Sequence, residues 1–214
     1  MDVLESLEVR WFLAAGDSVL GMVGPWFASA IVERGRRDDY LWTGRRDLGI
    51  KARGVDAAPT QLEVKYLVRS LGVAEVAPGM VGHLERWTKL SLPVDAPELG
   101  RRGRWVALAK ERRLRTFAFA GGLAREVRGS GRLDAGCGVE LTRVVVSEEG
   151  GAPPQVCFTV GIEAFGPEST LKASLDAACR AAADSGLAVQ LTSSSSMSYP
   201  EWLASSWAGR PDAT

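Results

Sequence analysis

The sequence predicts a mainly β fold, an antiparallel barrel or sandwich with a few helices. Most of the chain alternates apolar and polar residues with a period of two, which is typical of strands with one apolar face. Stretches rich in glycine, proline or charge separate these alternating segments. Many short strands with turn signals between them favour an antiparallel barrel or sandwich.

The first predicted strand, residues 6–13, illustrates the pattern. Val9 and Trp11 fall on its apolar face, and Glu8 and Arg10 fall on the opposite face. The same alternation predicts strands over residues 47–53, 62–68, 84–92, 105–119, 139–146 and 158–165. Turns are predicted near residue 35 and over residues 57–59, 93–103, 129–138 and 148–154.

Helices are the minority in this chain. Ser169 or Thr170 can cap a helix whose apolar residues recur at helical spacing, and Gly186 is positioned to end it. A weaker helical pattern covers residues 17–22. A short C-terminal element is predicted over residues 198–207.

The composition limits the classes of function that the chain can have. With 214 residues and no convincing linker, the chain is expected to form one domain, residues 1–214. The 26 Lys and Arg residues balance the 26 Asp and Glu residues, so no net basic charge favours nucleic acid or an anionic membrane as a partner. His83 is the only histidine, which excludes metal sites built from several histidines.

The cysteines and the first residues bear on location. Cys137, Cys157 and Cys179 form no C-x-x-C pair, and their odd number does not indicate a disulfide framework. The chain starts with acidic residues where a secretory signal is basic, and the longest weakly polar stretch, 19–32, is too short to span a membrane. A cytoplasmic protein with reduced cysteines is therefore expected.

The polar face of the predicted strands is unusually ionic for a solvated sheet face. It carries six basic and four acidic residues from different strands: Arg10, Lys51, Arg53, Lys65, Lys110 and Arg112, with Glu8, Glu63, Glu140 and Glu163. If the sheet closes with this face inward, the charges line one cavity, where a lower dielectric strengthens their interactions. Basic side chains bind phosphate oxygens, and clustered carboxylates tolerate one another best around Mg²⁺ or Mn²⁺. A charged lumen of this kind therefore indicates phosphate together with a divalent metal.

Two features of this polar face have alternative explanations. Alternation alone does not distinguish a lumen from a solvated face with Lys–Glu pairs between strands. Trp87 lies between Glu85 and Lys89 on the polar face and is a candidate for stacking on a base or a thiazole-like ring. Packing is the more common role of a tryptophan, and it remains the alternative for Trp87.

Short charged motifs follow one another in an order that resembles a known family. The segment 8–13, Glu-Val-Arg-Trp-Phe-Leu, is similar to the opening strand of the CYTH superfamily, the triphosphate tunnel metalloenzymes, whose hallmark is E-x-E-x-K. Segments similar to later motifs follow in family order at residues 39–41, 48–53, 62–65, 110–112, 139–141, 160–163 and 198–203. Each motif is short, so the specificity of the resemblance comes from their succession.

The resemblance implies both a fold and a function. The implied fold is an eight-stranded antiparallel closed tunnel barrel with a few flanking helices. The implied activity is metal-dependent hydrolysis of a phosphoanhydride bond in tripolyphosphate, a nucleoside triphosphate or thiamine triphosphate. Carried over by position, the phosphate-binding residues are Arg10, Lys51, Arg53, Lys65, Lys110 and Arg112. The residues carried over for Mg²⁺ or Mn²⁺ are Glu8 and Glu163, with Glu140 as a further candidate for metal or water.

Two positions depart from the family pattern. Ser6 stands where the family has its first glutamate, and Gly161 stands where it has the first glutamate of a later acidic pair. A serine hydroxyl is a poorer ligand for a hard dication than a carboxylate, and glycine supplies no side chain. The alternative function is therefore non-catalytic binding of polyphosphate or a nucleotide, with a degenerate metal site. A β-rich interaction protein without a small ligand is the third interpretation.

Overall fold

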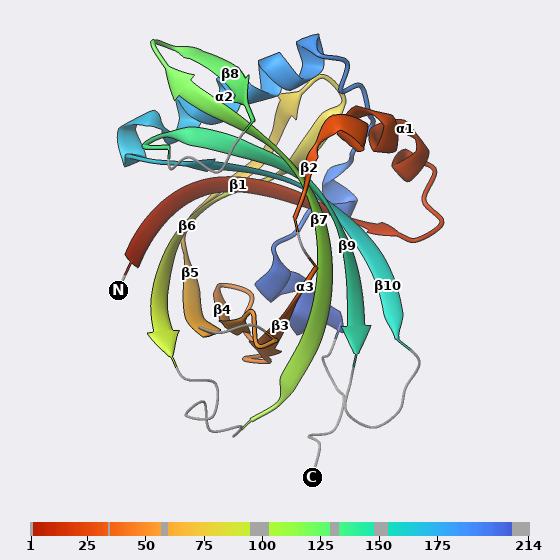
Figure 1. Ribbon diagram of the computed structural model, residues 1–214, viewed down its shortest axis with the longest axis vertical. Helices are drawn as coiled ribbons and strands as arrows, with labels where there is room; N and C mark the ends of the chain where they lie inside the picture. The colour runs from red at the N-terminus through yellow and green to blue at the C-terminus, as the bar shows by residue number, and fades with distance from the viewer. Residues whose placement is uncertain are drawn as a thin grey trace.

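The fold is a closed antiparallel β-barrel, seen in a computed structural model that describes residues 2–33, 35–56, 60–94, 103–128, 133–147 and 154–206 (Figure 1). Eight strands form the barrel in the order β7-β3-β4-β5-β6-β1-β10-β9, and β9 pairs with β7 again. Their bounds are β1 (Asp2–Ala14), β3 (Arg36–Leu41), β4 (Leu48–Arg53), β5 (Thr60–Ala77), β6 (Met80–Val94), β7 (Trp105–Ala120), β9 (Gly136–Ser147) and β10 (Gln155–Phe165). The predicted fold class is confirmed, and the pairing of β7 with β9 makes the sheet a barrel and not a sandwich.

Two short strands and three α-helices lie beside these strands in the described ranges. They are β2 (Ile31–Val32), β8 (Leu123–Val127), α1 (Val19–Trp26), α2 (Glu168–Asp184) and α3 (Tyr199–Ser206), with the 3₁₀ turns η1 (Phe27–Ser29) and η3 (Ser193–Ser195). β2 pairs with β7, and β8, which the sequence did not predict, forms a hairpin with β7. None of the helices described is long and apolar enough to cross a membrane.

Several strands are longer than predicted, β5 and β6 most of all, and both predicted helices shift. α1 covers Val19–Trp26 with Pro25 inside it, whereas the pattern predicted a helix over 17–22. β5 and β6 run beyond residues 62–68 and 84–92 because they form a long hairpin that turns at Gly79, where φ is +79°. Register shifts interrupt β5 after residue 67, so its period of two is hidden there. α2 begins at Glu168, one residue before the predicted caps.

Several predicted features fall where the structure describes nothing. The predicted turn at residues 57–59 lies outside the described residues, as do parts of the turns over 93–103, 129–138 and 148–154. The last residue of the predicted C-terminal element, Trp207, is also outside them. These parts of the predictions stay untested, whereas β9, which begins at Gly136, replaces the end of the turn predicted over 129–138.

The outward face of the barrel packs in a large apolar core with α2, which lies across the top of the view in Figure 1. Val9 and Trp11 of β1, Ile162 of β10 and Leu175 of α2 are almost completely buried in this core. Burial of each such side chain stabilises the fold by roughly 1.5–3 kcal/mol. Because neighbouring residues in a strand point to opposite faces, this packing turns the charged residues toward the lumen.

The C-terminal segment enters the barrel and fills part of its lumen. The ladder between β1 and β6 stops after Glu8 and Glu85, and farther along β1 Trp11 forms a bridge with Ser196 instead. α3 follows, and its Leu203 is buried against apolar side chains of β3, β7 and β9, namely Tyr40, Val106, Leu108, Val144 and Val146. This apolar plug leaves the remaining lumen to the charged residues.

Candidate functional site

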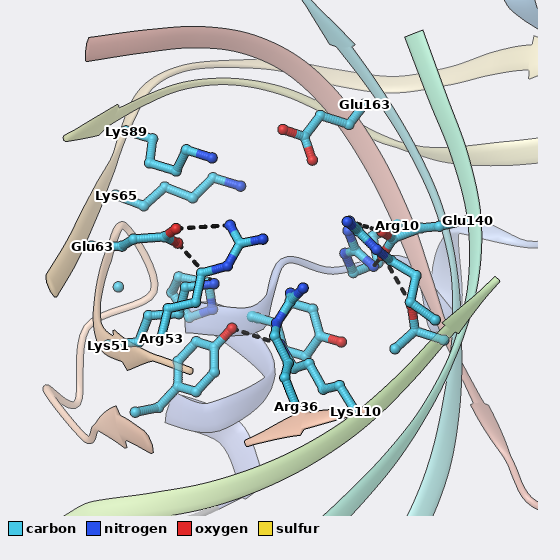
Figure 2. A pocket seen from close by; sticks show the side chains of 16 residues that line it. Arg10, Arg36, Lys51, Arg53, Glu63, Lys65, Lys89, Lys110, Glu140 and Glu163 are labelled. Atoms are coloured by element: carbon cyan, nitrogen blue, oxygen red, sulfur yellow. Dashed lines mark hydrogen bonds and ion pairs between the residues drawn. The ribbon is translucent and has the colours of Figure 1, made fainter. Parts of the chain in front are cut away.

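The lumen contains a cavity of about 230 Å³ with a strongly charged wall (Figure 2). Eight cationic side chains line it: Arg10, Arg36, Lys51, Arg53, Lys65, Lys89, Lys110 and Arg112. The lining also contains the carboxylates Glu63, Glu140 and Glu163 and the uncharged residues Tyr40, Gly49, Thr142, Tyr199 and Pro200. Figure 2 shows Glu63 and Glu140 on opposite sides of this cavity.

All six basic residues predicted from the sequence lie in this wall. The period of two explains their position, since Lys51 and Arg53 are two residues apart on β4, and Lys110 and Arg112 are two apart on β7. The structure therefore brings together side chains from strands that are distant in sequence. Their role in phosphate binding stays a prediction.

Glu63 on β5 is held by two cations from the neighbouring strand. Its Oε2 lies 2.9 Å from Nζ of Lys51, and its Oε1 accepts a hydrogen bond of 2.9 Å from Nη1 of Arg53. Burial raises the pKa of Glu63, but Lys51 and other nearby cations outweigh burial and lower this pKa to about 2. Glu63 is therefore ionised at neutral pH and fixes two of the cations that face the cavity.

Lys110 lies between two tyrosine side chains. Its Nζ donates a hydrogen bond of 2.7 Å to the hydroxyl of Tyr40 and lies 3.9 Å from the ring centroid of Tyr199. Asp38 has no exposed surface, and its Oδ2 lies 3.5 Å from Nζ of Lys51 and 3.6 Å from Nζ of Lys110. Burial and the charge of Lys51 hold the pKa of Lys110 well below its usual value, against the attraction of Asp38. An anion in the cavity would favour the charged form of Lys110.

Glu140 on β9 is held between two arginines. Nη1 of Arg10 donates a hydrogen bond of 2.5 Å to its Oε1, and Nη1 of Arg112 donates one of 3.0 Å to its Oε2. Glu33 holds Arg112 from the other side through Nε and Nη2, at 2.8 and 2.5 Å. Burial raises the pKa of Glu140, but the two arginines bring this pKa well below its usual value. Cations therefore engage both carboxylate oxygens of Glu140.

Glu8, a predicted metal ligand, lies outside the main cavity and pairs with Lys65. Its Oε2 lies 2.5 Å from Nζ of Lys65, and its Oε1 accepts a hydrogen bond of 2.5 Å from Oγ of Ser6. Burial raises the pKa of Glu8, but Lys65 outweighs burial and the pKa is lowered. Glu8 also lines a second cavity of about 20 Å³, together with His83 and Glu85. Ser6 thus holds Glu8 in place and does not replace the expected carboxylate.

Two charged side chains of the wall lack a partner among the residues that the structure describes. Glu163 on β10 lines the cavity, and no hydrogen bond or ion pair engages its carboxylate. The same holds for the amine of Lys89 on β6. These two groups can contact a ligand without breaking an internal pair.

The predicted metal ligands do not form a cation site by themselves. A hard dication binds several oxygen ligands, and those oxygens must not be engaged by other cations. Glu8 is paired with Lys65, arginines engage Glu140, and only Glu163 is free. Within the described ranges, no three His, Cys, Asp or Glu side chains gather at one point. The residues present therefore do not fit a site in which protein carboxylates hold Mg²⁺ or Mn²⁺.

Trp87, the candidate for stacking on a substrate ring, requires a correction. Its side chain has no exposed surface, and its Nε1 donates a hydrogen bond of 3.0 Å to Oε2 of Glu85. Nζ of Lys65 lies 5.1 Å from its ring centroid, so the ring packs against this lysine. Trp87 therefore supports Lys65 and offers no ring face to a ligand.

The sequence prediction omitted four residues that contribute chemistry to the wall: Arg36, Tyr40, Lys89 and Tyr199. Alternation had already placed Lys89 on the polar face of β6, but Lys89 was not named among the site residues. The charge-rich composition near residue 35 indicated a turn, so Arg36, the first residue of β3, was not assigned to a strand face. Tyr199 lies in the segment 198–203 that resembles the last family motif, but alternation gave it no direction, and the path of the C-terminal segment brings it to the cavity.

Comparison with known proteins does not assign the chain to a family. No protein-family model matches the chain, and no curated protein matches it significantly. The functional inference therefore depends on the cavity and its charges.

Proposed function

We propose that the protein binds a linear polyphosphate, or the triphosphate group of a small molecule, in the barrel lumen. The observation that carries this proposal is the convergence of eight cationic side chains on one cavity of about 230 Å³. Cations still outnumber carboxylates when Glu8, Glu33 and Asp38, which pair with these cations without lining the cavity, are counted. Cations crowded in a partly buried cavity repel one another, so a polyanion that enters it is strongly attracted.

The arrangement of the cations favours an extended anion over a single phosphate. They come from six strands: Arg10 from β1, Arg36 from β3, Lys51 and Arg53 from β4, Lys65 from β5, Lys89 from β6, and Lys110 and Arg112 from β7. A single phosphate reaches only the cations within about 3 Å of its oxygens, whereas a triphosphate carries charge along a chain. Arginine binds phosphate oxygens through paired N–H groups, and lysine binds them as a point charge.

Calorimetric titration with inorganic tripolyphosphate tests this proposal. We expect saturable binding that weakens as salt is added, with pyrophosphate binding more weakly and orthophosphate more weakly still. Lys51→Ala removes a cation from the wall and is expected to weaken binding about tenfold or more, because a hydrogen bond to a charged group contributes about 1.5–3 kcal/mol.

The control variant is Lys172→Ala, which removes one positive charge from an exposed position on α2. We expect its affinity for tripolyphosphate to equal that of the wild type. Absence of saturable binding, or an equal loss in the two variants, would refute the proposal.

Hydrolysis of the bound polyphosphate is a second candidate function, and the free carboxylate of Glu163 is the observation that favours it. A carboxylate in this position can orient a water molecule and accept its proton as the water attacks phosphorus. The attack forms a bond between phosphorus and the water oxygen and breaks the phosphoanhydride bond. The surrounding cations would stabilise the charge of the leaving phosphate.

Phosphate release from tripolyphosphate, ATP and thiamine triphosphate, with and without Mg²⁺ or Mn²⁺, separates the two candidate functions. Hydrolysis predicts turnover that Glu163→Gln lowers at least tenfold while the Kd for tripolyphosphate does not rise, because the wall only loses a negative charge. Binding without turnover of any of these compounds would leave the non-catalytic function and eliminate the hydrolase.

A further inference from the structure

Gly161 allows the side chain of Arg10 to cross a neighbouring strand. Arg10 on β1 lies opposite Gly161 on β10, and Gly161 lies opposite Glu140 on β9. A Cβ added at residue 161 would lie 2.8 Å from Nη1 and 2.9 Å from Cζ and Nη2 of Arg10. The guanidinium therefore occupies the volume that a side chain at residue 161 would fill, and it reaches Glu140 across β10.

Arg10 also occupies a central position among three inward carboxylates. Glu140 is directly opposite Gly161, Glu163 follows Gly161 by two residues, and Glu8 precedes Arg10 by two residues on the same inward face. Burial lowers the pKa of Arg10, but Glu140 and Glu8 help to raise it above its usual value. The carboxylates thus hold a permanent cation at this point of the lumen.

The guanidinium is fixed in place and keeps donors for a ligand. Nη1 donates to Glu140 and, at 3.0 Å, to Oγ1 of Thr159, whereas Nε and Nη2 have no partner in the described part of the chain. The ring of Tyr199 lies 4.9 Å from Cζ of Arg10. Since these contacts restrict the side chain before a ligand arrives, little conformational entropy remains to be lost on binding.

From this geometry we propose that the guanidinium of Arg10 replaces a divalent cation in the lumen, so that the protein binds polyphosphate without Mg²⁺ or Mn²⁺. This inference rests on the proposed function and specifies how the same site balances its charge. A dication needs carboxylate oxygens that no other cation engages, but Arg10 and Arg112 already engage both oxygens of Glu140. A dication placed there would also be repelled by the two arginines in a partly buried environment.

Titration of the wild type with tripolyphosphate in EDTA and in excess Mg²⁺ is the first test. We expect the Kd in EDTA to equal or to lie below the Kd in Mg²⁺, because Mg²⁺ binds free tripolyphosphate and competes with the protein. A Kd that is clearly lower in Mg²⁺ overturns the inference and leaves the proposed function standing. Absence of saturable binding in both conditions overturns both.

Two substitutions at residue 161 form a matched pair. Gly161→Glu displaces the guanidinium of Arg10 and adds a carboxylate beside Glu140 and Glu163. This variant is expected to bind tripolyphosphate at least tenfold more weakly in EDTA and to regain affinity in Mn²⁺. Gly161→Gln displaces Arg10 without adding charge, so we expect the loss in EDTA and no gain in Mn²⁺. A gain that is equal in the two variants contradicts the inference.

Uptake of Mn²⁺ alone gives a readout that does not depend on polyphosphate. The electron paramagnetic resonance signal of free Mn²⁺ is expected to fall when Gly161→Glu is added and to stay unchanged with the wild type or Gly161→Gln. Stoichiometric Mn²⁺ uptake by the wild type contradicts the inference.

A variant that leaves residue 161 intact covers the case in which these substitutions prevent folding. Arg10→Met keeps the length of the side chain but removes its charge, and we expect binding in EDTA to weaken about tenfold or more. Unchanged affinity of a folded Arg10→Met protein overturns the inference.

Discussion

The two faces of β1 have different surroundings, although residues of both faces alternate along the same strand. On the outward face, Val9 and Trp11 are buried in the apolar core with α2. On the inward face, Glu8 and Arg10 are each bonded to an opposite charge on another strand. Apolar burial stabilises the fold directly, whereas the attraction within each charge pair must first offset the desolvation cost of both charges. Substitutions on the two faces should therefore separate stability from ligand binding.

The largest expected effect on stability is on the outward face. Trp11→Ala removes a side chain with no exposed surface and its 2.8 Å hydrogen bond from Nε1 to the carbonyl oxygen of Val81. Such a loss is expected to lower the free energy of unfolding by about 3–5 kcal/mol, as measured by urea denaturation. If Lys51→Ala, on the inward face, lowers the free energy of unfolding as much as Trp11→Ala does, the two faces do not differ in their contribution to stability.

Glu140→Gln should change stability and binding in opposite directions. The substitution keeps the shape of the side chain but leaves Arg10 and Arg112 without their shared counter-charge. Breaking such a buried pair is expected to lower the free energy of unfolding by about 3 kcal/mol. The Kd for tripolyphosphate should fall at the same time, because the lumen gains net positive charge; a higher Kd would contradict this account of the inward face.

Ionisation of Glu85 on β6 is expected to make the free energy of unfolding depend on pH. Burial, with Glu201 and Glu8 nearby, raises the pKa of Glu85 to about 7, although Nε1 of Trp87 donates a hydrogen bond to it. Since the folded-state pKa lies above the usual value, the protonated form stabilises the fold at low pH. That stability is lost as the pH rises from about 4.5 through 7.

Glu85→Gln should remove this loss. At pH 8 the variant is expected to be more stable than the wild type by at most about 2 kcal/mol, given the partial exposure of Glu85, and equally stable near pH 4. Thermal unfolding across this pH range measures the difference, and parallel curves for the two proteins would argue against a raised pKa of Glu85.

The smallest expected effect is proton uptake when a polyanion binds. Because the pKa of Lys110 lies well below its usual value in the free protein, a bound polyphosphate should raise this pKa and draw a fraction of a proton from solution. Calorimetric titration in two buffers with different ionisation enthalpies counts the protons. Lys110→Met should take up fewer protons on binding than the wild type. Subtracting one number from the other removes the protons that the ligand itself exchanges. Equal proton uptake by the two proteins would show that a group other than Lys110 takes up the proton.

Much of the fold and of the cavity wall was predictable because strand geometry is local. The period of two assigns Arg10, Lys51 and Arg112 to one face and Val9 to the other without any knowledge of strand partners. The same alternation also assigned Trp87 to the charged face, but it carried no information on depth, and the ring is buried. Irregular segments were predicted less well, because bulges in β5 interrupt the period.

Pairings inside the lumen were not predictable in this way. Arg10 meets Glu140 because the register of three neighbouring strands aligns them across Gly161. Glu8 meets Lys65 because β1 and β5 both flank β6. These contacts join residues far apart in the sequence, and no local pattern carries the register of one strand against another.

The sequence by itself determined the alternation, and with it which side chains share a face of each strand. Tertiary structure decided that the charged face turns inward, that α3 fills one part of the lumen, and that Glu163 and Lys89 keep no partner among the described residues. The physical reason is that side-chain direction follows from the backbone of a single strand, whereas charge pairing and free charge depend on closure of the whole barrel.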